Sequence, residues 1–241
     1  MLYQAGHFLI ETFPQSIREH WRLIALSACL FFGSFFIMFV SVKLNPALIY
    51  SLMDYEQVAE FEMMYHPTNE RIGEKRDADS NFMMFGYYIY NNISIGFRTY
   101  SSGLLFGLGT LFFILFNGIF IGTVAGYLSQ LGYGTIFFSF VSGHSGPELI
   151  AIVIAGAAGL KLGQSLIAPK RYSRLQALQQ AARDSLPLVY GVIVLLLVAA
   201  FIEAFWSSMM NIAPIIKYIV GLSLWLLLLL YFILGGRHRG A

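Results

Sequence analysis

The sequence is poor in charge and contains a single cysteine. Asp, Glu, Lys and Arg make up 12% of the 241 residues, against roughly 25% in a typical soluble domain. A nucleic-acid-binding surface would show a basic stripe with exposed aromatic residues, and the sequence has no such stripe. Because Cys29 is the only cysteine, intrachain disulfides and thiolate metal clusters are excluded. Because the basic stripe is absent, we expect no nucleic-acid partner.

Apolar residues dominate what remains. The hydrophobic fraction is 57% and the aromatic fraction 16%, and a membrane-spanning helix needs about 20 such residues in a row. Good spans are predicted at residues 23–42, 103–128, 146–168, 186–206 and 215–234. The chain is therefore predicted to be a single integral membrane domain over residues 1–241, an all-α polytopic transmembrane helix bundle surrounded by the lipid bilayer, with no room for a soluble catalytic domain.

The distribution of charge predicts the orientation of this bundle. Lys and Arg flank the apolar runs in residues 1–22, in the connector 169–185 and in the tail 235–241, which predicts that these three segments are cytoplasmic. Eight of the thirteen acidic residues lie in residues 43–80, and this acidic segment is predicted to be external. The expected location is a bacterial or archaeal cell membrane, with both termini in the cytoplasm.

Two segments decide the number of crossings. Residues 81–97 are aromatic and interrupted by Asn91-Asn92, so hydropathy alone does not say whether they span. Parity between the flanking segments requires a crossing there, which gives six in total. Residues 129–145 have an apolar centre and are predicted to be either a surface loop or a re-entrant half-helix, since irregular backbone inside a membrane needs protein or water around it.

Two helix patterns suggest contact surfaces. Residues 172–185 are predicted to be a short cytoplasmic amphipathic helix with Leu175, Leu178 and Ala182 on one side, either a solvated connector or a surface for the membrane or a partner. In the predicted third span, five glycines are spaced near whole helical turns and form one stripe. They are Gly103, Gly107, Gly118, Gly122 and Gly126. Such a stripe allows close helix packing, either within the bundle or across a homodimer.

Polar residues inside the predicted spans are the candidate binding site. Ionisable groups are unfavourable in a bilayer, so they indicate function or need partners. The candidates predicted to meet in one external-side cavity are Asn91, Asn92, Asn117, His144, Glu148 and Glu203. Pro147 suits the first turn of a helix, so Glu148 could equally be a helix-start residue beside the helix dipole. Lys161 and Lys217 lie near span ends, where snorkelling to the interface would explain them.

These polar residues are compatible with several kinds of chemistry. If His144 and Glu203 meet, they could bind a cation or pass a proton, because histidine titrates near neutrality. One histidine and two glutamates could also hold zinc with an open position, but the spacing His-Glu-x-x-His is absent. The sequence has no Gly-x-Ser-x-Gly motif and no Walker loop. We therefore predict no catalytic residues, no metal ligands and no cofactor.

Several motifs together resemble a known family. They are Asn91-Asn92, Asn117-Gly118-Ile-Phe-Ile-Gly122, Gly143-His144-Ser-Gly146-Pro147-Glu148, Ala155-Gly156-Ala-Ala-Gly159-Leu160 and Ala200-Phe-Ile-Glu203-Ala204-Phe205. Over about residues 80–210 the chain resembles the stage II sporulation protein M (SpoIIM) family of polytopic membrane proteins. The namesake is a component of a peptidoglycan-degrading engulfment complex, and the wider family includes organisms that do not sporulate. The resemblance implies a fold more firmly than a task.

Two functional hypotheses follow. The first, which the resemblance implies, is a non-enzymatic scaffold or component of a membrane complex related to the cell envelope, with other membrane or envelope proteins as partners. The second is a transporter or channel for a small solute, ion or proton, whose path passes the polar residues named above, because intramembrane ionisable groups often mark such routes.

Overall fold

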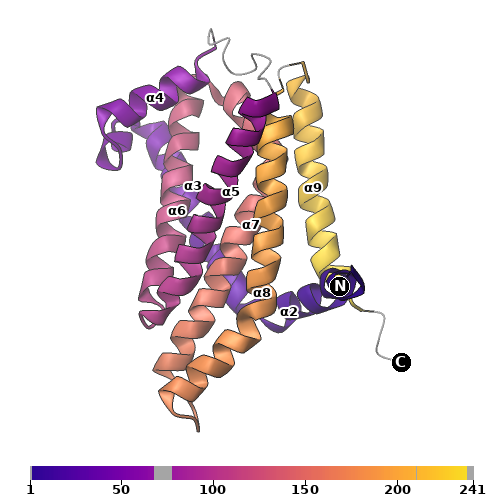
Figure 1. Cartoon of the computed structure of the whole chain (residues 1–241). Helices are drawn as coiled ribbons and strands as arrows, with labels where there is room; N and C mark the ends of the chain where they lie inside the picture. The colour runs from indigo at the N-terminus through magenta and orange to yellow at the C-terminus, as the bar shows by residue number, and fades with distance from the viewer. Residues whose placement is uncertain (1, 68–77, 210, 238–241) are drawn as a thin grey trace.

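The computed structural model describes residues 2–67, 78–209 and 211–237, and every regular element in these residues is helical (Figure 1). This confirms the predicted all-α bundle. The described part contains six helices longer than 20 residues. They are α3 (Trp21–Leu44), α5 (Ala78–Ser101), α6 (Leu108–Gln130), α7 (Gly134–Ile167), α8 (Arg174–Ile202) and α9 (Pro214–Leu234). Five of them, all except α5, are long and apolar enough to cross a membrane.

Residues 81–97 lie within helix α5. It is continuous through this segment, so the segment is neither broken nor re-entrant. Its 24 residues correspond to about 36 Å at a rise of 1.5 Å per residue, and it packs along α7 and α8 (Figure 1). Polar residues such as Asn91 and Asn92 lower its hydropathy. The sixth crossing therefore stays a prediction.

Helix α7 corrects the prediction for residues 129–145. A short turn at 131–133, with Gly132 at φ +83°, leads directly into a helix of 34 residues that begins at Gly134. The segment is neither a loop nor a half-helix, and His144 and Glu148 lie well inside α7. Pro147 is also internal. Proline is tolerated there because neighbouring helices in a bundle can compensate for the missing backbone hydrogen bond.

The connector after α7 also differs from the prediction. Residues 174–185 are the first turns of α8, which starts at a capping box formed by Ser173 and Gln176. Leu175 of the predicted apolar side is 64% exposed, and a different side, which carries small residues, packs inward. It consists of Ala177, Ala181 and Ser185. Together α7 and α8 form a hairpin that extends beyond the other helices at the bottom of Figure 1, and we call this side of the bundle the hairpin end.

The glycines are used for packing within the chain. A Cβ atom on Gly118, Gly122 or Gly126 would lie 2.2–2.6 Å from atoms of α3, which shows how closely α3 and α6 approach. Gly103 and Gly107 do not belong to this stripe, because they lie before α6 begins and face Gly159 and Gly163 of α7; Gly107 has φ +81°. The prediction of one stripe of five glycines was therefore wrong. All five glycines make close contacts within the chain, as the alternative of packing within the bundle predicted.

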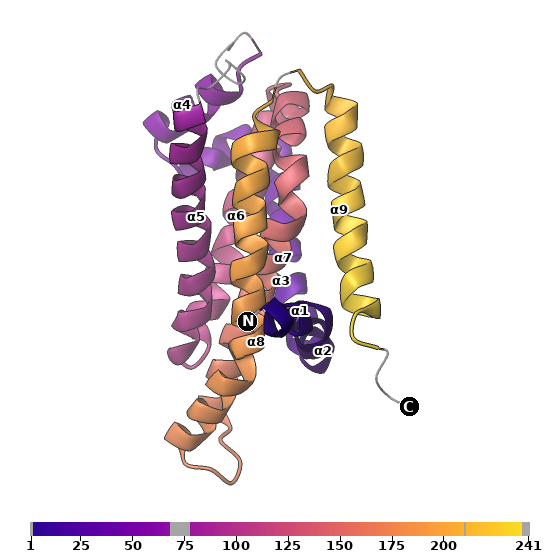
Figure 2. The ribbon, with the colours of Figure 1, turned by 45° about the vertical axis from the view of Figure 1, so that its right-hand side comes forward.

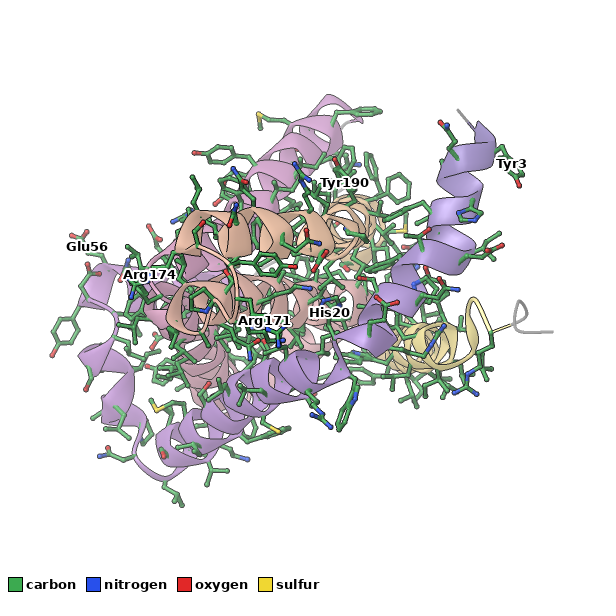
Figure 3. The ribbon with its side chains drawn as sticks, turned by 90° about the horizontal axis from the view of Figure 1, so that it is seen from below. Tyr3, His20, Glu56, Arg171, Arg174 and Tyr190 are labelled. Atoms are coloured by element: carbon green, nitrogen blue, oxygen red, sulfur yellow. The ribbon has the colours of Figure 1, made fainter. Side chains whose placement is uncertain are left out.

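Short helices lie across both ends of the bundle. At the hairpin end, α1 (Leu2–His7), a π-helical turn (Phe8–Thr12) and α2 (Phe13–Glu19) run across the long helices, as Figures 2 and 3 show. Arg18 of α2 donates hydrogen bonds to the carbonyls of Phe232 (3.0 Å) and Gly235 (2.6 Å) at the end of α9. A cation there also complements the negative end of the helix dipole.

The opposite end of the bundle is covered by the part of the predicted acidic segment that the structure describes. After α3, a 3-10 helix (Pro46–Ser51) leads into α4 (Tyr55–Tyr65), which lies against α6. A capping box formed by Asp54 and Gln57 starts α4. Val58 and Tyr65 are buried. We call this side the α4 end. Residues 68–77 of the acidic segment lie outside the described residues.

The close contact of α3 and α6 can be tested with glycine substitutions. Gly122→Ala would place a methyl group 2.3 Å from the Phe35 carbonyl oxygen, and overpacking of this kind typically destabilises by about 1–3 kcal/mol. Gly33→Ala on α3 is the matched control, because no atom lies within 4 Å of its added Cβ. We expect thermal unfolding in detergent to shift downward for Gly122→Ala only. Equal midpoints for both variants would contradict this packing.

Candidate functional site

The site begins with two residues one helical turn apart on α7. His144 and Glu148 are spaced i, i+4, so their side chains lie on the same face of the helix. The His144 Nε2 atom is 3.8 Å from Glu148 Oε2. His144 is 4% exposed, and its ring packs edge-to-face against Phe140 with 5.5 Å between centroids. The imidazole is therefore held in one orientation by its surroundings.

A π-helical turn at the end of α8 supplies the next residues. Helix α8 continues into a wider turn at Glu203–Ser207, and such turns occur frequently at functional sites. The Ser207 Oγ atom is 2.9 Å from His144 Nδ1. One ligand atom each of His144, Glu148 and Glu203 lies within 4.8 Å of the others. The three ionisable residues predicted from the sequence therefore form one cluster.

Helix α5 contributes the amide of Asn92. Asn92 is 3% exposed, and its Oδ1 accepts a hydrogen bond of 3.1 Å from Asn91 Nδ2. Its Nδ2 is buried without a hydrogen-bond partner of good geometry, and the Glu203 carboxylate is the acceptor beside it. Asn91 thus orients Asn92, and the Asn92 Nδ2 donor lies next to Glu203 in the cluster.

The cluster lies at a cavity of about 650 Å³ between α3, α6, α7 and α9. Its wall is mainly aromatic and aliphatic, and its polar lining includes His144, Glu148 and Glu203. Phe36 of α3 and Leu222 of α9 line it and are 59% and 73% exposed on the surface of the bundle. The cavity therefore opens sideways between α3 and α9, on the face that the lipid would cover.

Tyr65 at the end of α4 covers the cluster from the α4 end. Its ring lines the cavity and packs edge-to-face on Phe137 at 5.2 Å between centroids. Burial raises the pKa of the Tyr65 phenol above its usual range, and the nearby carboxylates of Glu203 and Glu148 raise it further. Tyr65 therefore stays a neutral hydrogen-bonding group beside two acidic side chains.

Two tryptophans pack beside the glycines of α7 that flank His144. A Cβ on Gly143 would lie 2.3 Å from the ring of Trp206. Trp225 lies beside Gly146, 3.5 Å from the position of an added Cβ. The Trp225 indole N–H donates to Ser145 Oγ at 3.2 Å. The missing side chain of Gly143 thus admits the ring of Trp206 beside His144.

One predicted residue does not join the site, and two residues of the site, Ser207 and Tyr65, were not predicted. Asn117 donates to the Phe113 carbonyl of its own helix at 2.7 Å and is not part of the cavity wall. Ser207 and Tyr65 were missed because nothing in the sequence links them to residues so far away. Lys217 was expected to snorkel to the interface, yet it is 6% exposed and donates to the Ser207 carbonyl at 2.7 Å. Lys161 likewise forms an ion pair of 3.3 Å with Asp184 at the hairpin end.

These features define a polytopic α-helical membrane protein with a buried polar cluster at a lateral cavity. Residues 27–208 match the model of the family stage II sporulation protein M, so the chain belongs to this family. It is also similar to an uncharacterised protein of Methanocaldococcus jannaschii, with 26% identity over 125 residues that cover 50% of this chain and 69% of the relative. No solved structure matches the chain. The family relationship confirms the resemblance seen in the motifs.

The proximity of two carboxylates predicts an effect on stability. Burial of Glu203, and then the nearby carboxylate of Glu148, disfavour the ionised form of Glu203. Glu203→Gln removes this cost, so it should stabilise the fold at pH 8 by about 0.5–2 kcal/mol, which is measured as a higher unfolding temperature. The control is Glu62→Gln, because Glu62 accepts a hydrogen bond of 2.5 Å from Tyr127, and replacing the charged acceptor by a weaker amide oxygen should lower the unfolding temperature. Destabilisation by both variants would argue against carboxylate repulsion in the cluster.

Proposed function

We propose that this SpoIIM-family protein is a non-enzymatic membrane component that binds a cation in the cavity at His144, Glu148 and Glu203. The supporting observation is the convergence of these side chains from α7 and the π-helical turn within 4.8 Å of one another. Two carboxylates and an imidazole favour a positively charged ligand, since a buried charge requires a partner. Of the two hypotheses drawn from the sequence, the solute-binding one has the more specific structural support.

The surroundings favour a binding site over an open pore. On the hairpin side of the cluster, α7 is closely packed, and residues 151–160 are buried throughout. Among the cavities found in the described residues, the one at the cluster does not share a lining residue with those around His20 and Lys161 at the hairpin end. Passage of a solute across the bundle would therefore require α7 to separate from its neighbours. Positively charged residues at the hairpin end support a cytoplasmic location for that end and an external location for the cluster.

The charge preference of the cavity can be measured by cysteine labelling. Cys29 is replaced by Ser, and Ser145, which lines the cavity, is replaced by Cys. A cationic methanethiosulfonate reagent added outside the cell should react faster than an anionic reagent of similar size, by on the order of 10-fold, because the carboxylates concentrate positive charge. The preference should disappear when Glu148 and Glu203 are both changed to Gln. A faster reaction with the anionic reagent would refute cation binding.

A second candidate function, attachment of partner proteins, is favoured by the projecting hairpin of α7 and α8. Arg171 and Arg174 lie near its tip (Figure 3), and Tyr172 and Leu175 beside them are 61% and 64% exposed. Exposed aromatic and arginine side chains are typical of protein-binding surfaces. This surface would serve a scaffold in an envelope-related complex, and it is compatible with cation binding elsewhere in the chain.

Photo-cross-linking tests this surface in living cells. A photoreactive amino acid at position 172 should give a discrete protein adduct, because a scaffold holds its partner at a fixed place. The same group at Leu222, which is exposed on the lateral face, is the matched control and should give none. Absence of a protein adduct at position 172, or equal adducts at both positions, would contradict a partner on the hairpin.

A further inference from the structure

We propose that the cation is a divalent transition-metal ion of the Zn²⁺ type, held by His144, Glu148 and Glu203. This inference rests on the proposed function, since it names the cation that the cavity binds. Within the described residues, this is the one group of three or more His, Cys, Asp or Glu side chains found close enough to hold a metal.

The donor set matches the ligand chemistry of zinc. Zn²⁺ accepts histidine nitrogen and carboxylate oxygen, and a site with three protein ligands keeps a fourth position open for water or a ligand. Ligand atoms around a tetrahedral Zn²⁺ lie about 3.4 Å apart, given bond lengths of about 2.1 Å. The His144–Glu148 pair at 3.8 Å is already close to this spacing. The remaining separations, up to 4.8 Å, can close through rotation of the glutamate side chains.

The partners of the two His144 ring nitrogens are compatible with coordination through Nε2. A metal-binding histidine usually donates its other ring N–H to a nearby oxygen, which fixes the ring and leaves one nitrogen free for the metal. Here Nδ1 lies 2.9 Å from Ser207 Oγ, while Nε2 points to Glu148. If Nδ1 carries the proton and donates to Ser207, Nε2 presents its lone pair to the cluster. Ser207 is therefore assigned as a positioning residue.

Asn92 provides an independent indication of a ligand. Its buried Nδ2 has no hydrogen-bond partner of good geometry, and the Glu203 carboxylate is the acceptor beside it. A buried donor without a well-formed hydrogen bond is unusual in a folded protein. Ligating carboxylates are themselves hydrogen-bonded by outer residues. Once one oxygen of Glu203 turns to a metal, the other can accept from Asn92. The same movement would satisfy the donor and orient the ligand.

A second, smaller cavity lies on the α4 side of the cluster. This cavity of about 150 Å³ is lined by Ser139, Ser207 and Lys217 and by residues at the ends of α4 and α7. Ser207 contacts both this cavity and His144. Phe140 lines both this cavity and the cavity at the cluster. An entry path from the α4 end, which a functional metal site requires, would therefore need the Phe140 side chain to move.

The full-length protein, purified in detergent with a tag that lacks histidine, is stripped with a chelator and titrated with Zn²⁺ alone. We expect one equivalent to bind per chain. His144→Ala and Glu203→Gln should each lose binding at least 10-fold, and Ser207→Ala should weaken it by about 10-fold, as for other outer-shell residues. The matched control is His7→Ala with Glu11→Gln, which removes another His–Glu pair at i, i+4 spacing and should leave the stoichiometry unchanged.

A measurement without substitutions covers the case of variants that fail to fold. Co²⁺ added to the stripped wild-type protein should give visible absorption bands of a four-coordinate ion, and Zn²⁺ should displace them. Less than a tenth of an equivalent of bound Zn²⁺, or an octahedral Co²⁺ spectrum that the substitutions do not alter, would overturn the metal assignment. If charge-selective labelling at Ser145→Cys persists in that case, the cavity still binds cations and the metal proposal alone has failed.

Discussion

The central constraint is that two carboxylates and an imidazole are removed from water in a bundle of apolar helices. Each of these groups needs a partner, because an unpaired charge in a membrane is strongly unfavourable. The partners come from three separate elements, namely α7, the π-helical turn after α8, and α5. These elements can therefore pack around His144 only if the polar side-chain atoms of the cluster find hydrogen-bond or charge partners among one another. The aromatic wall of the cavity encloses this cluster.

Close helix packing supplies the geometry for this cluster. Glycines of α6 bring it against α3, and Gly143 of α7 admits Trp206 next to His144. Small residues at helix contacts are the usual means of association where lipid removes the hydrophobic driving force between helices. The same residues that identify the family by sequence thus act mainly by shaping the space around the cluster, and the ionisable side chains supply its chemistry.

Much of the fold could be predicted from local patterns. Hydropathy located five of the six long helices, and the isolation of Glu203 in an apolar run correctly marked it as a residue that needs a partner. The start of α7 was misplaced because Pro147 resembles a first-turn proline, and only tertiary packing shows that a helix of 34 residues tolerates it. Ser207 and Tyr65 could not be found from sequence, since their role comes from contacts between distant segments. Membrane orientation and the crossing by α5 remain predictions.

The most direct test of the account is a double-mutant cycle between His144 and Glu203. The unfolding free energies of wild type, His144→Ala, Glu203→Gln and the double variant are measured in detergent. Residues that share a polar network show coupling of about 0.5–3 kcal/mol, whereas independent residues are additive within about 0.5 kcal/mol. We expect coupling within the first range. Additivity would show that α7 and the π-helical turn do not build one site.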